Sequence, residues 1–322
     1  MSFNHYLPAT YLANFSSNLS VPRRDSSIYV GKKFDGGIFQ SKVSNVCGIN
    51  NFYTLRDQLL DQSLIENHWT FYENKLHQSI SDLCLGKLIA IDWLTVMVPF
   101  VCGLFVRGPD FNERFESRFA ESQILSLANV DSTNFARVFE SQRIAPLIIS
   151  AYWTLLRSDG KVPLVVNELG YTPFTCLLTA EIGIAIPLNL EFILVITPCT
   201  RRAIITGSDN EWWPVIRNRT HVPQNSLDFN KSIAAYSQRF VFGCDRGVVD
   251  SSLQFSISRA TLPVVEPSVF GFHNPNLGRF YEEQWIRLVL HLDQKPRNGE
   301  FLYVDYLNPI NLSKRHGSFI FI

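Results

Sequence analysis

The stretch Leu88-Ile-Ala-Ile-Asp-Trp-Leu-Thr-Val-Met-Val-Pro-Phe-Val-Cys-Gly-Leu-Phe-Val106 is the most apolar part of this 322-residue chain. It carries a single charge, Asp92, and is close in length to a membrane-spanning helix. However, Pro99 and Gly103 interrupt it, and no cluster of basic residues marks a cytoplasmic side. The sequence therefore predicts a buried helix in the core of a protein that does not associate with a membrane.

The composition supports a large core. Hydrophobic residues make up 46% of the chain and charged residues only 18%, which excludes a disordered protein. Lys and Arg together number 29, as do Asp and Glu, so the formal net charge is zero. A zero balance argues against a broad basic surface for nucleic acid. A protein partner or a homo-oligomer is left open.

The segment before the apolar stretch predicts a hairpin and a helix. Two short β-prone runs, 27–30 and 38–43, flank an Asp-Gly-Gly turn, which is typical of a hairpin. Apolar residues then recur at steps of three and four over residues 63–86, as in a helix with one buried face. A capping box that includes Glu66 fits the start of this helix, and Gly86 fits its end.

The segment after the apolar stretch changes character near residue 160. We expect a helix over 132–157, started anew or kinked at Pro146, and further helices over 228–239 and 281–290. Apolar runs rich in β-branched or aromatic residues predict strands at 163–166, 182–187, 192–197, 203–206, 240–242, 253–257 and 301–304.

These elements indicate an α+β fold. Buried helices of the first half would pack on a mostly antiparallel sheet from the second half. We expect one large domain over residues 1–322. A sub-boundary near residue 160 would separate a mainly helical part with an N-terminal hairpin (1–160) from a mainly β part (161–322).

The cysteines and the N-terminal residues favour a cytoplasmic protein. The six cysteines form no Cys-x-x-Cys pair, so a zinc site built on close cysteine pairs is not expected. The first residues show no basic segment followed by an apolar run, as a secretory signal would.

Several segments together resemble one family. Asn4-His5-Tyr6-Leu7-Pro8, followed by Tyr11-Leu12-Ala13-Asn14-Phe15, resembles the opening of the domain of unknown function 4238 family, bacterial proteins with a His-Tyr-hydrophobic-Pro motif. Over roughly residues 4–245, other similar segments follow in the family's order: 51–54, 106–109, 153–156, 163–168, 185–189 and 193–195. The family name implies a fold but no activity.

The chain departs from the family pattern at one turn. It has Asn167-Glu168-Leu169-Gly170 where an Asp-Asn-Pro run is expected. Glu168 keeps the carboxyl group of the expected Asp, but its side chain is one methylene longer. Acids on turns at strand ends are common places for catalytic groups, whereas Asn and Gly also serve plain turns. The turn with Asp209 is a rival for the same role.

Three further residues are candidates for chemistry. His5, in a turn closed by Pro8, suits a general base or a metal ligand, or else it anchors the N-terminal segment by hydrogen bonds. Glu66 and Glu73 are seven residues apart and share a helical face beside the apolar stripe. The alternatives are a capping role for Glu66 and a solvated helix flank for Glu73.

Arg107 follows the apolar stretch and suits bidentate binding of a phosphate or carboxylate. Its alternative role is a charge at a helix C-terminus. Arg201 and Trp212, with neighbouring basic and aromatic residues, could stack on bases and hold phosphates, or else they are ordinary core and surface residues.

The absent motifs narrow the function. The chain has no phosphate loop, no Gly-x-Gly-x-x-Gly, no Gly-x-Ser-x-Gly and no His-Glu-x-x-His, so we expect no nucleotide cofactor and no zincin chemistry.

The first hypothesis is a metal-dependent hydrolase, of nuclease or phosphodiesterase type, that serves as a toxin or anti-phage effector. In it His5, Glu73 and Glu168 bind Mg²⁺ or Mn²⁺ or act as base, Arg107 holds the phosphate, and Asn167, Arg201 and Trp212 bind substrate. The alternative is a non-catalytic sensor or protein-interaction module that uses Trp212 and Trp213.

Overall fold

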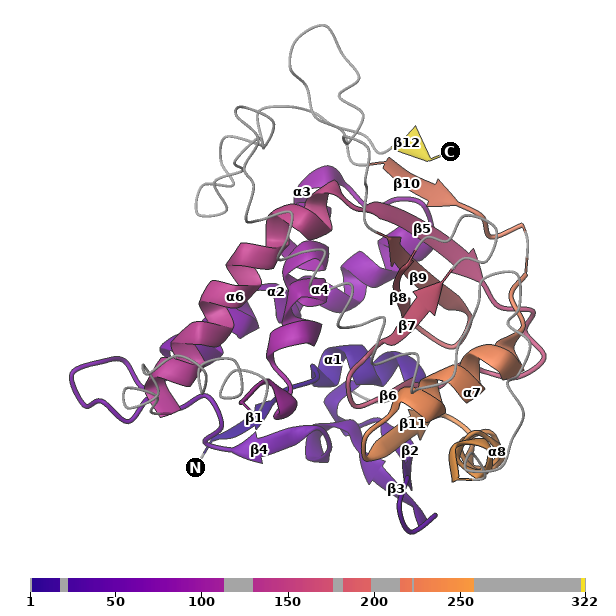
Figure 1. Cartoon of the computed structure of the whole chain (residues 1–322), viewed down its shortest axis with the longest axis horizontal. Helices are drawn as coiled ribbons and strands as arrows, with labels where there is room; N and C mark the ends of the chain where they lie inside the picture. Colours follow the sequence, from indigo (N-terminus) through magenta and orange to yellow (C-terminus); the bar gives the residue numbers. More distant parts are fainter. Residues whose placement is uncertain are drawn as a thin grey trace, which may run out of the picture.

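The computed structural model of the chain describes residues 2–17, 23–112, 130–175, 182–197, 215–221, 223–257 and 320–321. In this part a layer of helices lies against a mixed sheet, and a smaller sheet lies toward the N-terminal strands (Figure 1). This is an α+β fold with most helices in the first half, as the sequence predicts. None of the helices described there is long and apolar enough to cross a bilayer.

The helical layer is built around the apolar stretch. Residues 90–106 form a continuous helical run: α3 (Ala90–Asp92), a π-helical turn (Trp93–Met97) and α4 (Val98–Val106). All residues of α4 except Pro99 are buried, which confirms the predicted core helix. The long helices α2 (Leu64–Cys84) and α6 (Val130–Ser150) both contact α4.

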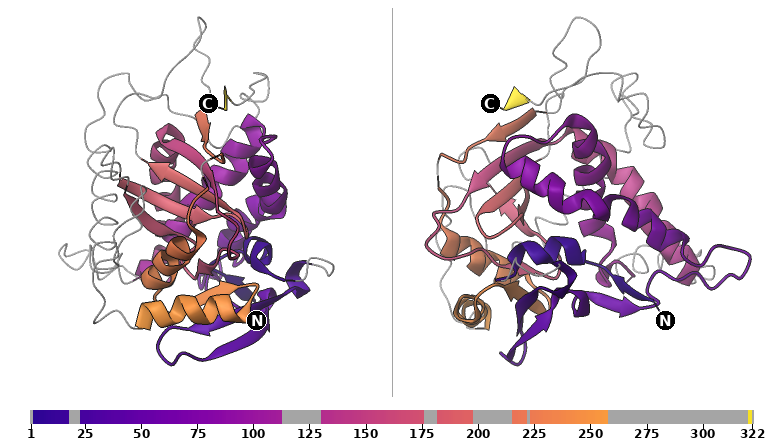
Figure 2. Two further views of the ribbon diagram at one scale, coloured as in Figure 1. Left: turned by 90° about the vertical axis from the view of Figure 1, so that its right-hand side faces the viewer. Right: turned by 180° about the vertical axis from the view of Figure 1, so that it is seen from behind.

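The larger sheet has six strands in the order β12-β10-β5-β9-β8-β7. Four of them, β5, β9, β8 and β7, are antiparallel neighbours, whereas β10 runs parallel to both β5 and β12. The two views in Figure 2 show this sheet beside the helical layer. Its strands are Tyr152–Arg157 (β5), Thr172–Thr175 (β7), Ile182–Pro187 (β8), Phe192–Thr197 (β9), Val215–Asn218 (β10) and Ile320–Phe321 (β12).

The smaller sheet joins segments from both sides of residue 160. Its antiparallel order is β3-β2-β11-β6, with β2 (Ser27–Lys32) and β3 (Ile38–Lys42) forming the predicted hairpin. The strands β6 (Val166–Asn167) and β11 (Phe240–Gly243) come from the second half. The helices α7 (Ser226–Tyr236) and α8 (Arg246–Ile257) contact this sheet.

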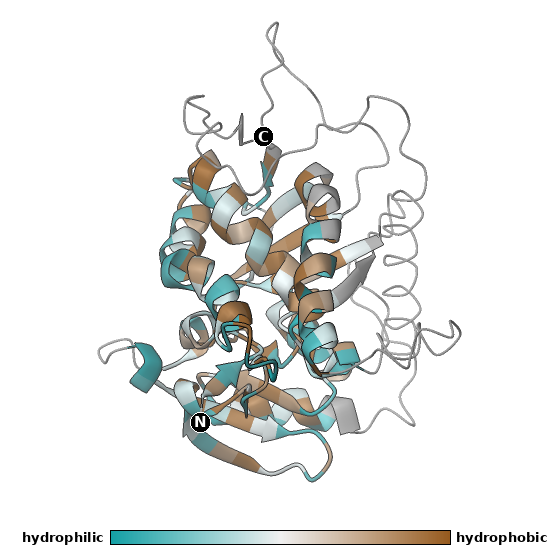
Figure 3. Cartoon of the chain, turned by 90° about the vertical axis from the view of Figure 1, so that its left-hand side faces the viewer, coloured by the Kyte–Doolittle hydropathy of each residue, from teal (hydrophilic) through white to brown (hydrophobic). Residues whose placement is uncertain are grey.

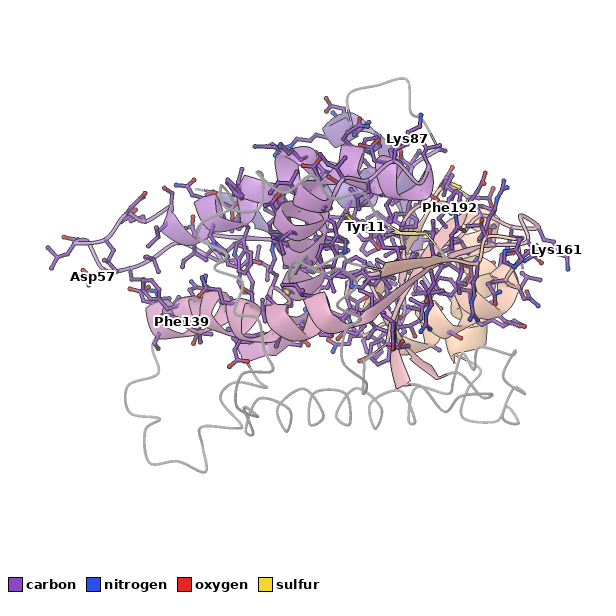
Figure 4. The ribbon with its side chains drawn as sticks, turned by 90° about the horizontal axis from the view of Figure 1, so that it is seen from above. Tyr11, Asp57, Lys87, Phe139, Lys161 and Phe192 are labelled. Carbon is purple, nitrogen blue, oxygen red and sulfur yellow. The ribbon has the colours of Figure 1, made fainter. Side chains whose placement is uncertain are left out.

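The N-terminal segment runs between these layers. Strand β1 (Phe3–His5) pairs with β4 (Gly48–Asn50), and α1 (Ala9–Leu12) leads into a 3-10 turn, η1 (Ala13–Phe15). Two more 3-10 turns are η2 (Arg23–Asp25) and η3 (Val43–Asn45). The hydroxyl of Tyr11 reaches the carbonyl oxygen of Pro187 at 2.5 Å, so α1 is fixed against β8. Figure 4 places Tyr11 inside the molecule and Asp57 and Lys161 at opposite ends.

Among the described residues, two predicted elements are wrong in type, whereas the strands predicted at 203–206 and 301–304 and the helix predicted over 281–290 lie outside the described ranges. The helix predicted over 132–157 continues through Pro146 but ends at Ser150, and β5 replaces its last turns. There Trp153 and Leu155 are buried on one face of a strand that pairs with β9. The strand predicted at 253–257 is the last part of α8, because Leu253 packs beside Val249, one helical turn earlier, against β2.

The helical layer and the larger sheet meet at a pair of buried tryptophans. The rings of Trp93 and Trp153 pack edge to face with centroids 5.4 Å apart. The indole nitrogen of Trp153 also donates to the carbonyl oxygen of Ile148 at 2.9 Å, near the end of α6. Figure 3 shows hydrophobic and hydrophilic residues alternating along the helices of this layer, as expected for helices with one buried face.

Replacing Gly31 with Ala should destabilise the fold. A Cβ at this position of β2 would lie 2.6 Å from Cγ1 of Val249 and 2.4 Å from Cδ1 of Leu253, so α8 would have to move. We expect Gly31→Ala to lower the free energy of unfolding by roughly 1–3 kcal/mol in urea denaturation. Gly247→Ala, on the exposed side of the same helix, is the matched control and should be neutral or stabilising by up to about 1 kcal/mol. Equal effects of the two changes would contradict the close packing of α8 on β2.

Candidate functional site

The candidate site is built around Arg107, which directly follows α4 and is 1% exposed. Its guanidinium donates to the hydroxyls of Tyr53 (3.4 Å) and Tyr72 (2.9 Å). It also donates to Oε1 of Glu73 at 2.5 Å and to the backbone carbonyl oxygen of His5. These contacts occupy four of its five N–H donors. Arg107 therefore ties together β1, the loop after β4, α2 and the end of α4.

Aromatic rings enclose this guanidinium. Its central carbon lies 5.2 Å from the ring centre of Trp69 and 5.7 Å from that of Tyr53. The hydroxyl of Tyr53 in turn donates to the carbonyl oxygen of Arg107 at 3.0 Å. Burial raises the pKa of both Tyr53 and Tyr72, so both phenols stay neutral. The positive charge is thus held among neutral hydroxyls, ring faces and the carboxylate of Glu73.

The spacing of residues on α2 explains why these groups meet. Trp69 and Tyr72 belong to the buried face, whereas Glu66 and Glu73 lie seven residues apart at its border. The close approach of α4 requires Gly103, because a Cβ there would lie 2.7 Å from the hydroxyl oxygen of Tyr72. A small residue in α4 thus allows the phenol of Tyr72 to reach Arg107.

The two glutamates of α2 are not equivalent. Glu73 is the ion-pair partner of Arg107, and its side chain is 16% exposed. Glu66 has a buried carboxylate oxygen, Oε2, for which the described part of the chain offers no hydrogen-bond partner. Burial raises the pKa of Glu66, and the charge of Glu73 adds to this, while Arg107 and Asn4 oppose it. Glu66 therefore stays protonated to a higher pH than a free glutamate would.

The predicted capping box does not form at the start of α2. The side chain of Ser63 makes no capping hydrogen bond, and its hydroxyl instead donates to Asp61 at 2.6 Å. Glu66 is thus released from the local role that the sequence suggests, and it belongs to the group around Arg107.

His5 joins this group through both its backbone and its ring. Its Nε2 donates to the carbonyl oxygen of Ser44 at 3.1 Å, so the neutral ring has its lone pair on Nδ1. Burial lowers the pKa of His5 below 6.5; the nearby charge of Glu73 opposes this shift, and Arg107 and Arg24 add to it. The imidazole is therefore neutral near pH 7 and able to accept a proton.

An exposed cation lies beside these groups. Arg24 lies in η2, which contacts η3, the turn that bears Ser44, the hydrogen-bond partner of the His5 ring. Its charge acts on the pKa of both His5 and Glu66. Unlike Arg107, it is exposed to solvent. We call His5, Glu66, Glu73 and Arg107, with Tyr53 and Tyr72, the Arg107 cluster.

Glu168 and Asn167 belong to a different network. The carboxylate of Glu168 accepts hydrogen bonds from the backbone N–H groups of residues 238–240, at 2.5, 2.7 and 3.0 Å. Burial raises its pKa, although these donors oppose the shift. The amide nitrogen of Asn167 donates to the carbonyl oxygens of Tyr171 and Ile233. Glu168 therefore fixes the connection between α7 and β11, and Asn167 fixes its own turn against α7, so both side chains have structural roles.

The predicted residues are thus only partly brought together. His5, Glu73 and Arg107 converge, and Glu168 and Asn167 do not join them. Within the described ranges no group of three or more His, Cys, Asp or Glu side chains is arranged to hold a metal, so His5, Glu73 and Glu168 do not form such a set. Arg201, Trp212, Trp213 and Asp209 lie outside the described residues.

The sequence analysis missed Arg137, which holds the end of α4. Its guanidinium is fully buried and donates to the carbonyl oxygens of Val106 and, at 2.9 Å, Gly108. It lies 4.7 Å from the ring centre of Phe52 and 4.8 Å from that of Phe111. An arginine among apolar residues of a helix is the signal that could have indicated this role.

Comparison with known protein families gives a match over most of the chain. A family model described as Protein of unknown function (DUF4238) matches residues 4–247. None of the curated proteins and none of the solved structures matches the chain.

Removal of Arg107 should be costly. Arg107→Ala leaves Glu73 without its cation and two buried hydroxyls without their donor, so we expect a loss of roughly 3–5 kcal/mol in the free energy of unfolding. Arg157→Ala is the matched control, because Arg157 pairs with Glu191 on the surface and should contribute about 1 kcal/mol or less. Urea denaturation measures both. A loss at Arg107 no larger than that at Arg157 would show that the buried arginine does not organise the fold.

Glu168→Gln tests the role assigned to that acid. A glutamine keeps one acceptor oxygen but turns an amide toward at least one of the three backbone donors of residues 238–240. We expect a decrease of roughly 1–3 kcal/mol in the free energy of unfolding by urea denaturation. Glu191→Gln, an exposed acid, is the control. A stability equal to that of the control would argue against Glu168 as the anchor of this turn.

Proposed function

Because the chain belongs to the DUF4238 family, a family of proteins of unknown function, its activity has to be inferred from the site, and we propose that it is a phosphodiester hydrolase. The observation that carries the proposal is the meeting of His5, Glu66 and Glu73 around one buried guanidinium. Within this group the pKa of an acid is raised and that of a base is lowered. These shifts keep Glu66 protonated to a higher pH, and His5 neutral to a lower pH, than the free side chains, so one group can give a proton while the other accepts one.

The roles follow from the protonation states. Nδ1 of His5 takes a proton from a water molecule as the water oxygen bonds to phosphorus. Glu66, in its protonated form, gives a proton to the oxygen that leaves phosphorus. The carboxylate of Glu73, paired with Arg107, lies near His5 and stabilises the imidazolium formed in this step.

The phosphate would be bound by Arg24, not by Arg107. The contacts of Arg107 with four neighbours and its 1% exposure make it a positioning residue. Arg24 is exposed and lies near both His5 and Glu66. This local cation agrees with a chain whose net charge is zero and which has to bind an anion in a small site.

The metal and the biological role are separate proposals. A dependence on Mg²⁺ or Mn²⁺ is tested by running the same assay with either ion and with EDTA. Cleavage of cellular nucleic acid would harm the cell that makes the protein, which supports the role of a toxin or anti-phage effector in a bacterium.

The pH profile of hydrolysis tests the acid–base assignment. The base His5 has to be neutral, and its pKa lies below 6.5; the acid Glu66 has to be protonated, and its pKa lies above 4.5. We therefore expect a bell-shaped profile of kcat/KM, whose acidic limb reports protonation of His5 and whose alkaline limb reports ionisation of Glu66. Release of p-nitrophenol from bis(p-nitrophenyl) phosphate and cleavage of a single-stranded oligonucleotide are the two measurements.

Three variants separate chemistry from folding. His5→Ala removes the ring but keeps the carbonyl that Arg107 contacts, and Glu66→Gln keeps the shape of the acid. We expect each to lower kcat by roughly 10²–10⁴-fold while the unfolding curve changes little. Glu191→Gln is the control and should match the wild type. Activity retained in both site variants, or absent from the wild type on both substrates, would overturn the proposed function.

A further inference from the structure

A second group of polar side chains lies farther along α2. Nδ1 of His77 is 2.7 Å from Oδ1 of Asn14, which lies in η1. Because an amide oxygen only accepts, Nδ1 carries the hydrogen and Nε2 holds the lone pair. Asn14 is 8% exposed. Its Nδ2 is buried and has no hydrogen-bond partner in the described residues, and the same holds for Oγ1 of Thr10, one helical turn earlier.

The unpaired amide nitrogen of Asn14 suggests that a further group binds beside it. Leaving such a donor unpaired costs about 1–3 kcal/mol, and most buried polar groups in proteins are paired with protein, water or ligand. The free atoms of Asn14 are N–H donors, so the occupant has to be an acceptor.

The position of this group relates it to the Arg107 cluster. Glu66, Thr70, Glu73 and His77 follow one another on α2 at steps of four, three and four residues, so they lie on one face of the helix. All four are partly buried. His77 therefore lies one helical turn beyond Glu73, with Cβ atoms about 5–6 Å apart.

The charges favour an anion. Arg23 is exposed and lies in η2, which contacts α1, the helix that leads into η1 with Asn14 and packs against α2 with His77. Its charge acts on the pKa of His77. Burial, and then the charge of Arg23, lowers the pKa of His77 to about 4, and no acid contributes to this shift. The N–H donors of Asn14 and the positive charge of Arg23 therefore both favour the binding of an anion.

We propose that Asn14, His77 and Arg23 form a subsite for a second phosphate group of the substrate, one helical turn from the bond that is cleaved. This inference rests on the proposed function and sharpens it. The substrate would be a chain with consecutive phosphates, such as a single-stranded nucleic acid, that lies along the polar face of α2. Arg24 and Arg23 would each hold one phosphate.

Binding of inorganic phosphate, followed by NMR of His77, tests the subsite without any enzyme assay. The His77 resonances are assigned by comparison with His77→Gln. An anion beside the imidazole favours its protonated form, so we expect saturating phosphate to raise the pKa of His77 by one unit or more. An unchanged His77 titration in wild-type protein would overturn the proposal whatever the variants do.

Two variants and one control locate the anion. Asn14→Leu removes the amide donors and Arg23→Gln removes the cation, and each should weaken phosphate binding, measured by the His77 shift, by tenfold or more. Arg157→Gln changes an exposed arginine elsewhere and should bind phosphate as the wild type does. Equal phosphate binding by all three variants would also overturn the subsite.

The two proposals fail separately. A phosphate-dependent His77 shift in a protein that hydrolyses neither substrate would keep the subsite and remove the hydrolase. Hydrolysis that depends on His5 and Glu66, together with no His77 shift, would remove the subsite alone.

Discussion

The structure depends on the burial of the charge of Arg107. Moving a guanidinium out of water is costly unless hydrogen bonds and an opposite charge compensate it. The compensating groups come from β1, from the loop that bears Tyr53, and from α2, at sequence separations of 34 to 102 residues. The apolar helix α4 can be buried to its end only if these segments are in place. One interaction therefore couples the folding of the N-terminal strand to that of the helical layer.

Local patterns predict the local elements well. The three- and four-residue repeat marks α2, the Asp-Gly-Gly turn marks the hairpin of β2 and β3, and the apolar stretch marks α4. The errors at β5 and α8 have one cause: short apolar runs fit a helix or a strand, and tertiary partners decide. For β5 the partner is β9, and for α8 it is the space above Gly31.

The sequence predicts only part of the candidate site, because local patterns do not report which distant segments meet. The pattern of α2 places Glu66 and Glu73 on one face, and the position of Arg107 after an apolar helix is unusual enough to be noticed. No local pattern shows that Tyr53 and Tyr72 contact this arginine. Nor does one show that the carboxylate of Glu168 accepts hydrogen bonds from backbone N–H groups 70 or more residues away. Contacts between distant segments carry no period in the sequence, so their partners become known only in three dimensions.

The contact between Arg107 and β1 involves the backbone of residue 5 and not its side chain. A carbonyl oxygen is present whatever the amino acid, so this anchor is indifferent to mutation at that position. The side chain of residue 5 can therefore vary in evolution without loss of the contact that holds β1 to the end of α4. Related proteins can keep this fold while the chemical character of this position changes.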